Sequence, residues 1–264
     1  MQVTVKAIGV NRADVFYRQG KYPFFGLELS GIAQNGKRVA AIVNGGAYAE
    51  TVEVQEECII EIPDSMSFEE AAAITESLFT AYHNLVSLCK IKAGENVLIH
   101  GGASGVGVVA IQLAKLLGAN VSATAGKKEK LELIEKLGAN AIDYNTKDFG
   151  KEKFDVILDI VGASYFDANL AALKRGGRLA IISFIGGAKT EVNLAPLLLK
   201  SLQVFGSTIT GLSAQERAKL RDDIKPYFVQ IKPVIDKVFP ISEKDKALDY
   251  VEKYGNVGKV VVAV

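Results

Sequence analysis

The chain has 264 residues, 49% of them apolar, and its 31 Lys and Arg nearly balance its 30 Asp and Glu. This length predicts one large domain or two closely packed domains with a sizeable core, and it excludes a disordered tail. No block of like charges offers a surface to nucleic acid or lipid, and no run of 18 uncharged apolar residues exists, so we expect a small-molecule partner and no membrane span.

The two cysteines, Cys58 and Cys89, form no CxxC pair. The N-terminal stretch MQVTVKAIGVNRAD has a polar residue and a lysine where a secretory signal carries its apolar run. Both observations favour a reduced, cytoplasmic protein.

Residues 1–75 are rich in glycine and β-branched side chains, as in KRVAAIVNGGAYAETVEV, and show little helical periodicity. One short helix is predicted, near Arg12 to Arg18. We expect the segment to form an irregular, mostly antiparallel β lobe.

From about residue 95, short β-like runs alternate with helical runs. In chain order they are NVLIH, a helical run over 105–117, NVSAT, a helical run over 128–137, AIDY, FDVILDIV, RLAIIS and VFGSTI. Strands that are apolar on both faces and alternate with helices predict a doubly wound parallel sheet, the Rossmann fold. The tetrapeptide LGAN occurs twice, which places Gly118 and Gly138 after two successive helices as left-handed C-caps.

The last fifty residues return to strand character in PVIDKVF and GKVVVAV, around a helical EKDKALDYVEKYG. We expect them to fold back onto the N-terminal lobe. The predicted domains are therefore a β domain of residues 1–75 and 213–264 and a Rossmann domain of residues 76–212. The run LQVFGSTI is expected at the edge of the parallel sheet, where it could pair with its copy in a homodimer or contribute to a tetramer.

A glycine cluster, HGGASGVG, occupies residues 100–107 between the first strand of the βα series and its first helix. It is either a cradle for a cofactor's phosphates or a tight corner in the core. The spacing Gly102-x-Ser104-x-x-Gly107 follows the dinucleotide fingerprint with serine replacing one glycine; a second register, starting at Gly105 and ending at Ala110, also matches. We favour the first register because its opening glycine lies at the strand end. Backbone N–H groups at this helix start are then expected to face a pyrophosphate. The residues concerned are Gly102, Ala103, Ser104, Gly105, Val106 and Gly107.

The end of the second strand distinguishes NADPH from NADH. In SATAGKKEKL, the position near Gly126 where an acidic residue would bind the ribose 2'-hydroxyl carries no acid, and Lys127 and Lys128 follow it. Ammonium groups favour a 2'-phosphate, so NADPH is the expected cofactor. The alternative is a solvated first helical turn, although cations there oppose the helix dipole by roughly 0.3–1 kcal/mol each.

Several motifs along nearly the whole chain indicate a known family. In order they are GVNRADVFYRQGKYP, GLELSG, GGAYAE, AAAITESLFTAYHNL, VLIHGGASGVG, ATAGKKEKLELIEKLGA and NVGKVVV. The chain resembles the zinc-free medium-chain dehydrogenases/reductases, and among them the zeta-crystallin-like NADPH:quinone oxidoreductases of the p53-inducible type. The resemblance implies a GroES-like catalytic lobe, a Rossmann lobe and a cofactor cleft between them. We expect the catalytic lobe to be trimmed, because the chain begins at what should be the second strand of that lobe.

Zinc-dependent members of this superfamily carry a cysteine at the position of Asn11 and a histidine at that of Leu27, before Glu28. Neither ligand is present in this chain, and four structural cysteines are missing as well. His83 and His100 have no partner ligands at suitable spacing, so we expect each to be packed or hydrogen-bonded. The resemblance therefore implies an acceptor that needs no metal.

The resemblance also implies roles for individual residues in the active-site segment. Tyr22 would lie near the nicotinamide, with Asn11 as a polar contact and Asp14 beside them, and the proton would come from solvent or through a Tyr22 relay. In the alternative interpretation Asn11 is a helix N-cap, Asp14 is its first-turn acid and Tyr22 covers a loop. Further cofactor contacts are implied for Thr80, Tyr144, Ser183, Phe184, Ser207, Thr208 and Ile209.

Hydride transfer from NADPH to a quinone is the activity that the resemblance implies, achieved mainly by orientation and by exclusion of water. Reduction of an alkenal, an enone or an enoyl thioester is the alternative among enzymes, and it would require a proton donor. A protein that binds nucleotides or RNA without turnover, like some zeta-crystallin relatives, is a different class. The scattered basic residues argue against an RNA track.

Overall fold

The computed structural model describes residues 1–264 and contains two compact units. Met1–Phe79 and Leu212–Val264 form the first, which we call the mixed-sheet unit, and Thr80–Gly211 form the second, the parallel-sheet unit. None of the helices combines the length and the apolar character needed to cross a membrane.

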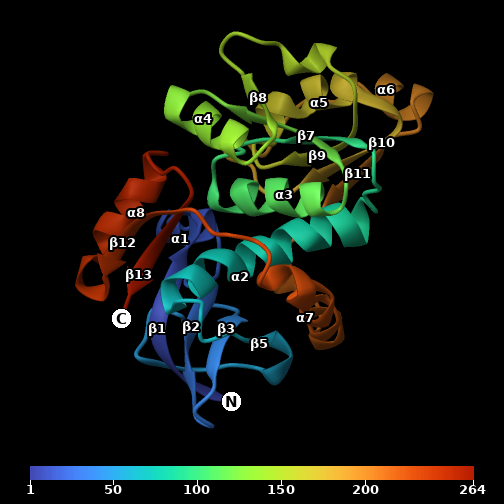
Figure 1. Ribbon diagram of the computed structural model, residues 1–264. Helices are drawn as coiled ribbons and strands as arrows, with labels where there is room; N and C mark the ends of the chain where they lie inside the picture. Colours follow the sequence, from blue (N-terminus) through green and yellow to red (C-terminus); the bar gives the residue numbers. More distant parts are fainter. The chain divides into compact units, whose positions relative to one another are not determined.

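The parallel-sheet unit is built on six parallel strands in the order β11-β10-β9-β6-β7-β8 (Figure 1). Of these six strands, β6 comes first along the chain and lies in the middle of the sheet. The strand order reverses between β6 and β9. This is the doubly wound arrangement, so the predicted Rossmann fold is confirmed. The strands are β6 (Asn96–Ile99), β7 (Asn120–Ala125), β8 (Asn140–Asp143), β9 (Phe154–Asp159), β10 (Leu173–Ile181) and β11 (Gln203–Gly206).

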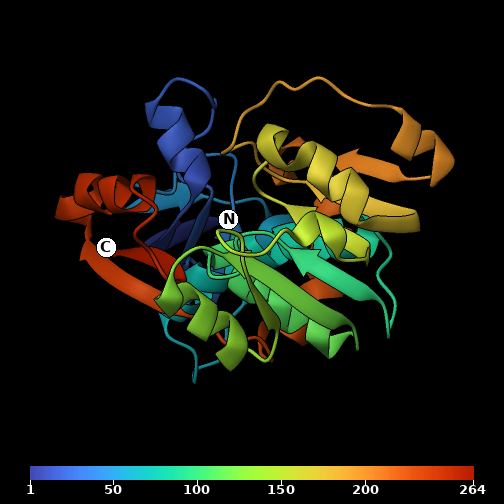
Figure 2. The same cartoon turned by 90° about the horizontal axis from the view of Figure 1, so that it is seen from above.

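Helices cover both faces of this sheet (Figure 2). Right-handed crossovers place α3 and α4 on one face and, because the strand order reverses, α5 and α6 on the other. Gly118 and Gly138 have φ of 80° and 75°, as predicted for residues that end a helix in the left-handed region. The helices are α3 (Gly105–Leu116), α4 (Lys128–Lys136), α5 (Phe166–Ala172) and α6 (Ala195–Leu199), with the π-helix η2 (His83–Leu88) and the short 3-10 helices η3 (Phe149–Lys151), η4 (Ala163–Tyr165) and η5 (Ile209–Gly211).

The mixed-sheet unit contains a seven-stranded sheet in the order β12-β13-β1-β2-β3-β5, with β4 also paired to β1. All pairs are antiparallel except β12 with β13, which confirms a mostly antiparallel lobe. The pairing of β13 with β1 confirms that the end of the chain returns to the N-terminal lobe. The strands are β1 (Gln2–Val10), β2 (Glu28–Ala33), β3 (Arg38–Ile42), β4 (Thr51–Glu53), β5 (Ile59–Glu61), β12 (Ile235–Pro240) and β13 (Lys259–Ala263).

Helix α1 (Arg12–Arg18) lies where a short helix was predicted, and its arginines bind α8 (Lys244–Glu252). Arg12 donates to the carbonyl oxygen of Val251 at 2.5 Å, and Arg18 donates to the Asp249 carboxylate at 2.7 Å. The short turns η1 (Glu56–Cys58) and η6 (Ile241–Glu243) complete this unit together with α2 and α7.

Four of the helices, α2, α5, α6 and α7, were not predicted. Helix α2 (Phe68–Tyr82) begins inside the segment expected to hold only one short helix, and its consecutive buried alanines hide the helical period. Helix α7 (Ala214–Phe228) is mostly polar and contains Pro226, which hides it in the sequence. Its capping box of Ser213 and Glu216 could nevertheless have indicated where the helix begins.

Candidate cofactor and catalytic sites

The carboxyl ends of β6 and β9 flank the point where the strand order of the parallel sheet reverses. In doubly wound sheets a ligand binds at this crevice. Residues 100–107 follow β6, and residues 160–162 follow β9. Of the cofactor residues named above, Thr80 lies on α2, and the others follow the carboxyl ends of β6, β7, β8, β10 and β11.

The joint between β6 and α3 has no room for side chains at two of its glycines. A Cβ on Gly107 would overlap the carbonyl oxygen of Gly101, and a Cβ on Gly102 would lie 2.5 Å from the Cβ of Ala123. At Gly107 the backbone of α3 therefore packs directly against the backbone of Gly101 and Gly102. This is the close helix-to-strand approach that the preferred register assigns to Gly107.

Ser104 replaces a fingerprint glycine and caps α3. Its Oγ accepts a hydrogen bond from the Gly107 N–H at 3.0 Å. The serine thus satisfies one of the donors at the start of α3, while the helix end keeps its partial positive charge. Backbone N–H groups at such an end are suited to a phosphate anion.

A second part of the site lies where β7 and β8 end. A Cβ on Gly126 would overlap the ring of Tyr144, so the ring lies directly on the Gly126 backbone. Asn145 Nδ2 donates to the Gly126 carbonyl oxygen at 3.0 Å and holds the two strand ends together. Lys127 is the N-cap residue of α4, and the Lys128 side chain is 90% exposed.

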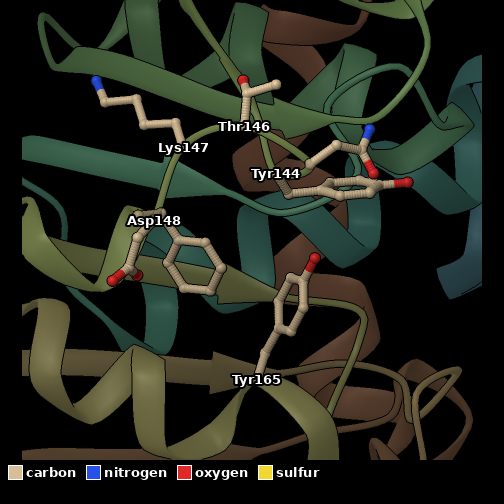
Figure 3. Close-up of a pocket in the computed structure, with 7 residues that line it drawn as sticks. Tyr144, Thr146, Lys147, Asp148 and Tyr165 are labelled. Carbon is tan, nitrogen blue, oxygen red and sulfur yellow. The ribbon is translucent and has the colours of Figure 1, made fainter.

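A pocket of about 370 Å³ opens beside these strand ends (Figure 3). Tyr165 lies below Tyr144 in this view and points its hydroxyl end toward it, while Lys147 and Asp148 lie to the left of both tyrosines. The apolar ring of Phe149 packs against Tyr165 at 4.9 Å between ring centroids. The pocket lies between the segment after β8 and Tyr165, which follows β9, and aromatic side chains in such a position are suited to stacking on a flat ring. Its lining residues are Tyr144, Asn145, Thr146, Lys147, Asp148, Phe149 and Tyr165.

The segments after β10 and β11 form the rest of the crevice wall. Gly186 N–H donates to the Val161 carbonyl oxygen at 2.7 Å, which ties the Ser183–Phe184 segment to the loop after β9. Ser207 Oγ donates to Asn84 Oδ1 at 2.8 Å, and Asn84 Nδ2 donates to the Thr80 carbonyl oxygen at 2.9 Å. Asn84 is a buried residue that the sequence analysis did not single out.

In the mixed-sheet unit, Asn11 is both a helix N-cap and the centre of a polar cluster. Its backbone N–H donates to Asp14 Oδ2 at 2.8 Å, as in a capping box. Its side chain is engaged elsewhere: Nδ2 donates to Glu28 Oε1 at 2.8 Å, and Oδ1 accepts from Lys259 Nζ at 2.7 Å. The backbone of Asn11 therefore fits the N-cap interpretation, while its side chain is bound within this cluster.

Asp14, Glu28 and Lys259 are buried together around Asn11. Lys259 Nζ lies 2.6 Å from Glu28 Oε1, and the other Glu28 oxygen accepts from the Glu76 N–H at 2.6 Å. Asp14 Oδ1 accepts from the Gly26 N–H at 2.7 Å. Burial raises the pKa of Asp14 to about 7, against the opposing effect of its two N–H donors and of Lys259.

Two tyrosines are related to this cluster. Tyr22 follows it closely in the chain, and Tyr48 lies close to Asp14 and Glu28 in space. Tyr22 is half-buried and packs edge-on against Phe24 with 5.7 Å between ring centroids. Tyr48 stacks on Phe25 at 4.3 Å, and burial, followed by the charges of Asp14 and Glu28, raises the pKa of its hydroxyl well above the usual value. Tyr48 belongs to the motif GGAYAE, yet it had been assigned no role.

The residues of this cluster do not fit a zinc ion. The position near Glu28 and Asn11 already holds the Lys259 ammonium, a buried cation that satisfies the acidic side chain. No group of three or more His, Cys, Asp or Glu is arranged to hold a metal. His100 is buried and hydrogen-bonded to Thr124 and Asn169, as expected of a histidine inside the core.

Known proteins share this architecture over the whole chain. A family described as zinc-binding dehydrogenase matches residues 105–225. A quinone oxidoreductase of Lama guanicoe is 29% identical, covering 98% of this chain and 87% of that protein. A quinone oxidoreductase-like protein 2 homolog of Nematostella vectensis is 30% identical, covering 99% of this chain and 81% of that protein. The chain belongs to the quinone oxidoreductase family.

The solved structures of this family agree with that assignment. The quinone oxidoreductase of Thermus thermophilus, solved alone and in complex with NADPH, is 30% identical and superposes with a TM-score of 0.86, covering 100% of this chain and 90% of that chain. The resemblance predicted from motifs is therefore confirmed, and so is the medium-chain dehydrogenase/reductase fold.

Proposed function

We propose that this protein is an NADPH-dependent quinone oxidoreductase that works without zinc. The observation that carries the proposal is the glycine joint at the β6–β9 crevice, in a chain that matches quinone oxidoreductases over almost its full length. We assign cofactor binding to the parallel-sheet unit and substrate binding to the mixed-sheet unit. The buried cysteines, both free thiols, support a reduced cytoplasmic location.

Residues of the parallel-sheet unit would hold NADPH in three places. The start of α3 from Gly102 to Gly107 takes the pyrophosphate, and the Tyr144–Tyr165 pocket takes the adenine. Lys127 and Lys128 take the 2'-phosphate, since they stand at the start of α4, directly after Gly126, where an acid would otherwise bind the ribose. The segments at 183–184 and 207–209, with Thr80, are assigned to the nicotinamide side.

Bound NADPH supplies a hydride, so the protein has to orient the acceptor and exclude water. Tyr22, with its phenolic hydroxyl, is assigned to the acceptor side as a proton relay. Asn11 is assigned as a polar contact and a positioning residue, because both ends of its amide are already bound within the cluster. Asp14 is fully buried, so we assign it to ordering the Asn11 and Gly26 backbone and not to contact with substrate.

The activity assay follows NADPH oxidation by the full chain with ortho- and para-quinones, an enone and crotonyl thioester. We expect saturable turnover with quinones and at least tenfold lower kcat/KM with the enone and the thioester. The Gly107→Ala variant is the control with impaired cofactor binding, because its new Cβ would overlap the Gly101 carbonyl oxygen. Preference for the enone would replace the proposed substrate class, and NADPH binding without turnover on any acceptor would indicate a protein without catalytic function.

We also propose a homodimer formed through the edge of the parallel sheet. Strand β11 is an edge strand, and α6 beside it in the chain carries the most exposed leucines, Leu198 at 79% and Leu199 at 70%. Val204 on β11 is exposed as well. An unpaired edge next to exposed leucines is suited to a second copy of the same surface about a two-fold axis.

A further inference from the structure

Four buried polar side chains lie behind the cofactor crevice and are not used by the proposed binding site. They are Thr124 on β7, His100 after β6, Asn169 on α5 and Asp159 at the end of β9, and all are at most 1% exposed. Burying four polar groups side by side is unfavourable unless every one is hydrogen-bonded. Their contacts satisfy this condition, and we refer to the four as the buried polar chain.

The hydrogen bonds of the buried polar chain run in one direction. Asn169 Nδ2 donates to Asp159 Oδ2 at 3.0 Å, so Asn169 Oδ1 accepts from His100 Nε2 at 2.8 Å. His100 Nδ1 is then an acceptor for the Thr124 hydroxyl at 3.1 Å. This arrangement requires a neutral imidazole, and burial lowers the pKa of His100 to about 4.

Each end of the buried polar chain binds the backbone of a crevice loop. At the β6 side, Thr124 Oγ1 accepts from the Gly101 N–H at 3.3 Å. At the β9 side, the Asp159 carboxylate accepts from the N–H groups of Val161 at 2.6 Å and Gly162 at 3.1 Å. The glycine joint and the loop after β9 are thereby connected through side chains, in addition to the strand pairing of β6 and β9.

The loop after β9 in turn holds the segment after β10. Ala163 N–H donates to the Gly187 carbonyl oxygen at 2.9 Å, and a Cβ on Gly162 would lie 3.0 Å from the Phe184 Cα. A shift at Asp159 would therefore be transmitted to the segment assigned to the nicotinamide side.

We propose that Thr124, His100, Asn169 and Asp159 are positioning residues that set the spacing between the glycine joint and the loop after β9, and thereby the affinity for NADPH. The inference rests on the proposed cofactor site. A hydrogen-bonded network of this kind specifies one geometry, whereas apolar replacements would fill the same volume without fixing the loop N–H groups.

The test measures NADPH dissociation constants of the full chain by calorimetry. Thr124→Val keeps the volume and removes the hydroxyl, whereas Thr124→Ser keeps the hydroxyl. Ile157→Val, a fully buried change on β9, is the matched control for a general loss of packing. We expect Thr124→Val to bind NADPH at least fivefold more weakly than wild type, and Thr124→Ser and Ile157→Val to stay within twofold.

Equal weakening by all three variants, or unchanged binding by Thr124→Val, would overturn the inference. Asp159→Asn tests the other end of the buried polar chain and replaces Thr124→Val if that variant does not fold. In the double variant the two losses should not multiply, because both disrupt one connected unit; full multiplication would show independent roles. If wild type itself takes up no NADPH, the proposed function fails instead, so the two failures are distinguishable.

Discussion

Gly126 and Lys127 are adjacent at the end of β7, and we assign them different roles at the adenosine end of the proposed site. Gly126 allows the Tyr144 ring to lie on the backbone. Lys127 places an ammonium at the N-terminal end of α4, where the helix dipole is positive. That position is unfavourable by roughly 0.3–1 kcal/mol for a cation until an anion binds beside it. A phosphate at this point would remove the conflict.

The Lys127→Glu variant is therefore expected to bind NADPH at least tenfold more weakly, which corresponds to about 1.4 kcal/mol. Its affinity for NADH, which has no 2'-phosphate, should change less than twofold. Lys136→Glu, in the last turn of the same helix, is the matched control and should leave both affinities unchanged. Fluorescence titration with each nucleotide measures the effect, and an unaltered NADPH affinity in Lys127→Glu would remove the 2'-phosphate assignment.

Residues next to a recognisable motif were open to prediction from sequence, and residues joined across the fold were not. Gly107 and the helix start at Ser104 follow from a local spacing. Thr124 and Asn169 meet His100 only because β7 and α5 lie beside β6 in the folded unit, over separations of 24 and 69 residues. No pattern along the chain encodes such a meeting, so the buried polar chain could be found only in the structure.

Among the helices and strands, those with a clear local pattern could be predicted and those without one could not. The strands of the parallel sheet could be predicted because they are apolar on both faces and alternate with helices. Helix α2 was missed because its consecutive buried alanines hide the helical period, and α7 because it is mostly polar, with Leu220, Ile224 and Phe228 as its buried apolar residues. Both helices lie near the changeover between the two units.

A buried ion pair joins three elements of the mixed-sheet unit. Lys259 on β13 binds Glu28 on β2 and the side chain of Asn11, the N-cap of α1, across 248 residues of chain. Lys259 is 4% exposed and Glu28 is fully buried. Removing one partner of such a pair leaves an uncompensated buried charge, whereas removing both is far less costly.

Lys259→Met is accordingly expected to lower the free energy of unfolding by about 3–5 kcal/mol. The double variant Lys259→Met with Glu28→Gln should recover part of this loss, because no unpaired carboxylate remains at position 28. Lys37→Met, which removes an exposed partner of Glu61, is the control and should change stability by less than about 1 kcal/mol. Urea unfolding followed by circular dichroism gives the values, and a Lys259→Met variant as stable as the Lys37→Met control would contradict the structural role of the pair.

The molecule as a whole divides its proposed work between two units with different sheets. In the parallel sheet the carboxyl ends of all strands lie at the same end of the sheet. Loops from five strands can therefore meet one extended cofactor. The antiparallel lobe instead brings sequence-distant residues such as Asn11 and Lys259 into one cluster. The family resemblance could be predicted from motif order, because most of the motifs lie at strand ends or tight turns, and AAAITESLFTAYHNL lies in α2 and η2.

We expect the edge strand β11 of the parallel sheet to determine how copies of the protein assemble. Wild type should sediment as a pair of 28.3 kDa chains, because β11 and the exposed leucines of α6 offer a self-complementary edge. A variant with Leu198→Asp and Val204→Asp should sediment as a monomer, since two like charges would face their copies across the axis. Leu116→Asp changes an equally apolar residue, 47% exposed on α3, and should leave the dimer intact. Sedimentation velocity separates the outcomes, and a wild-type chain that stays monomeric at micromolar concentration would place the leucines of α6 outside any interface between copies.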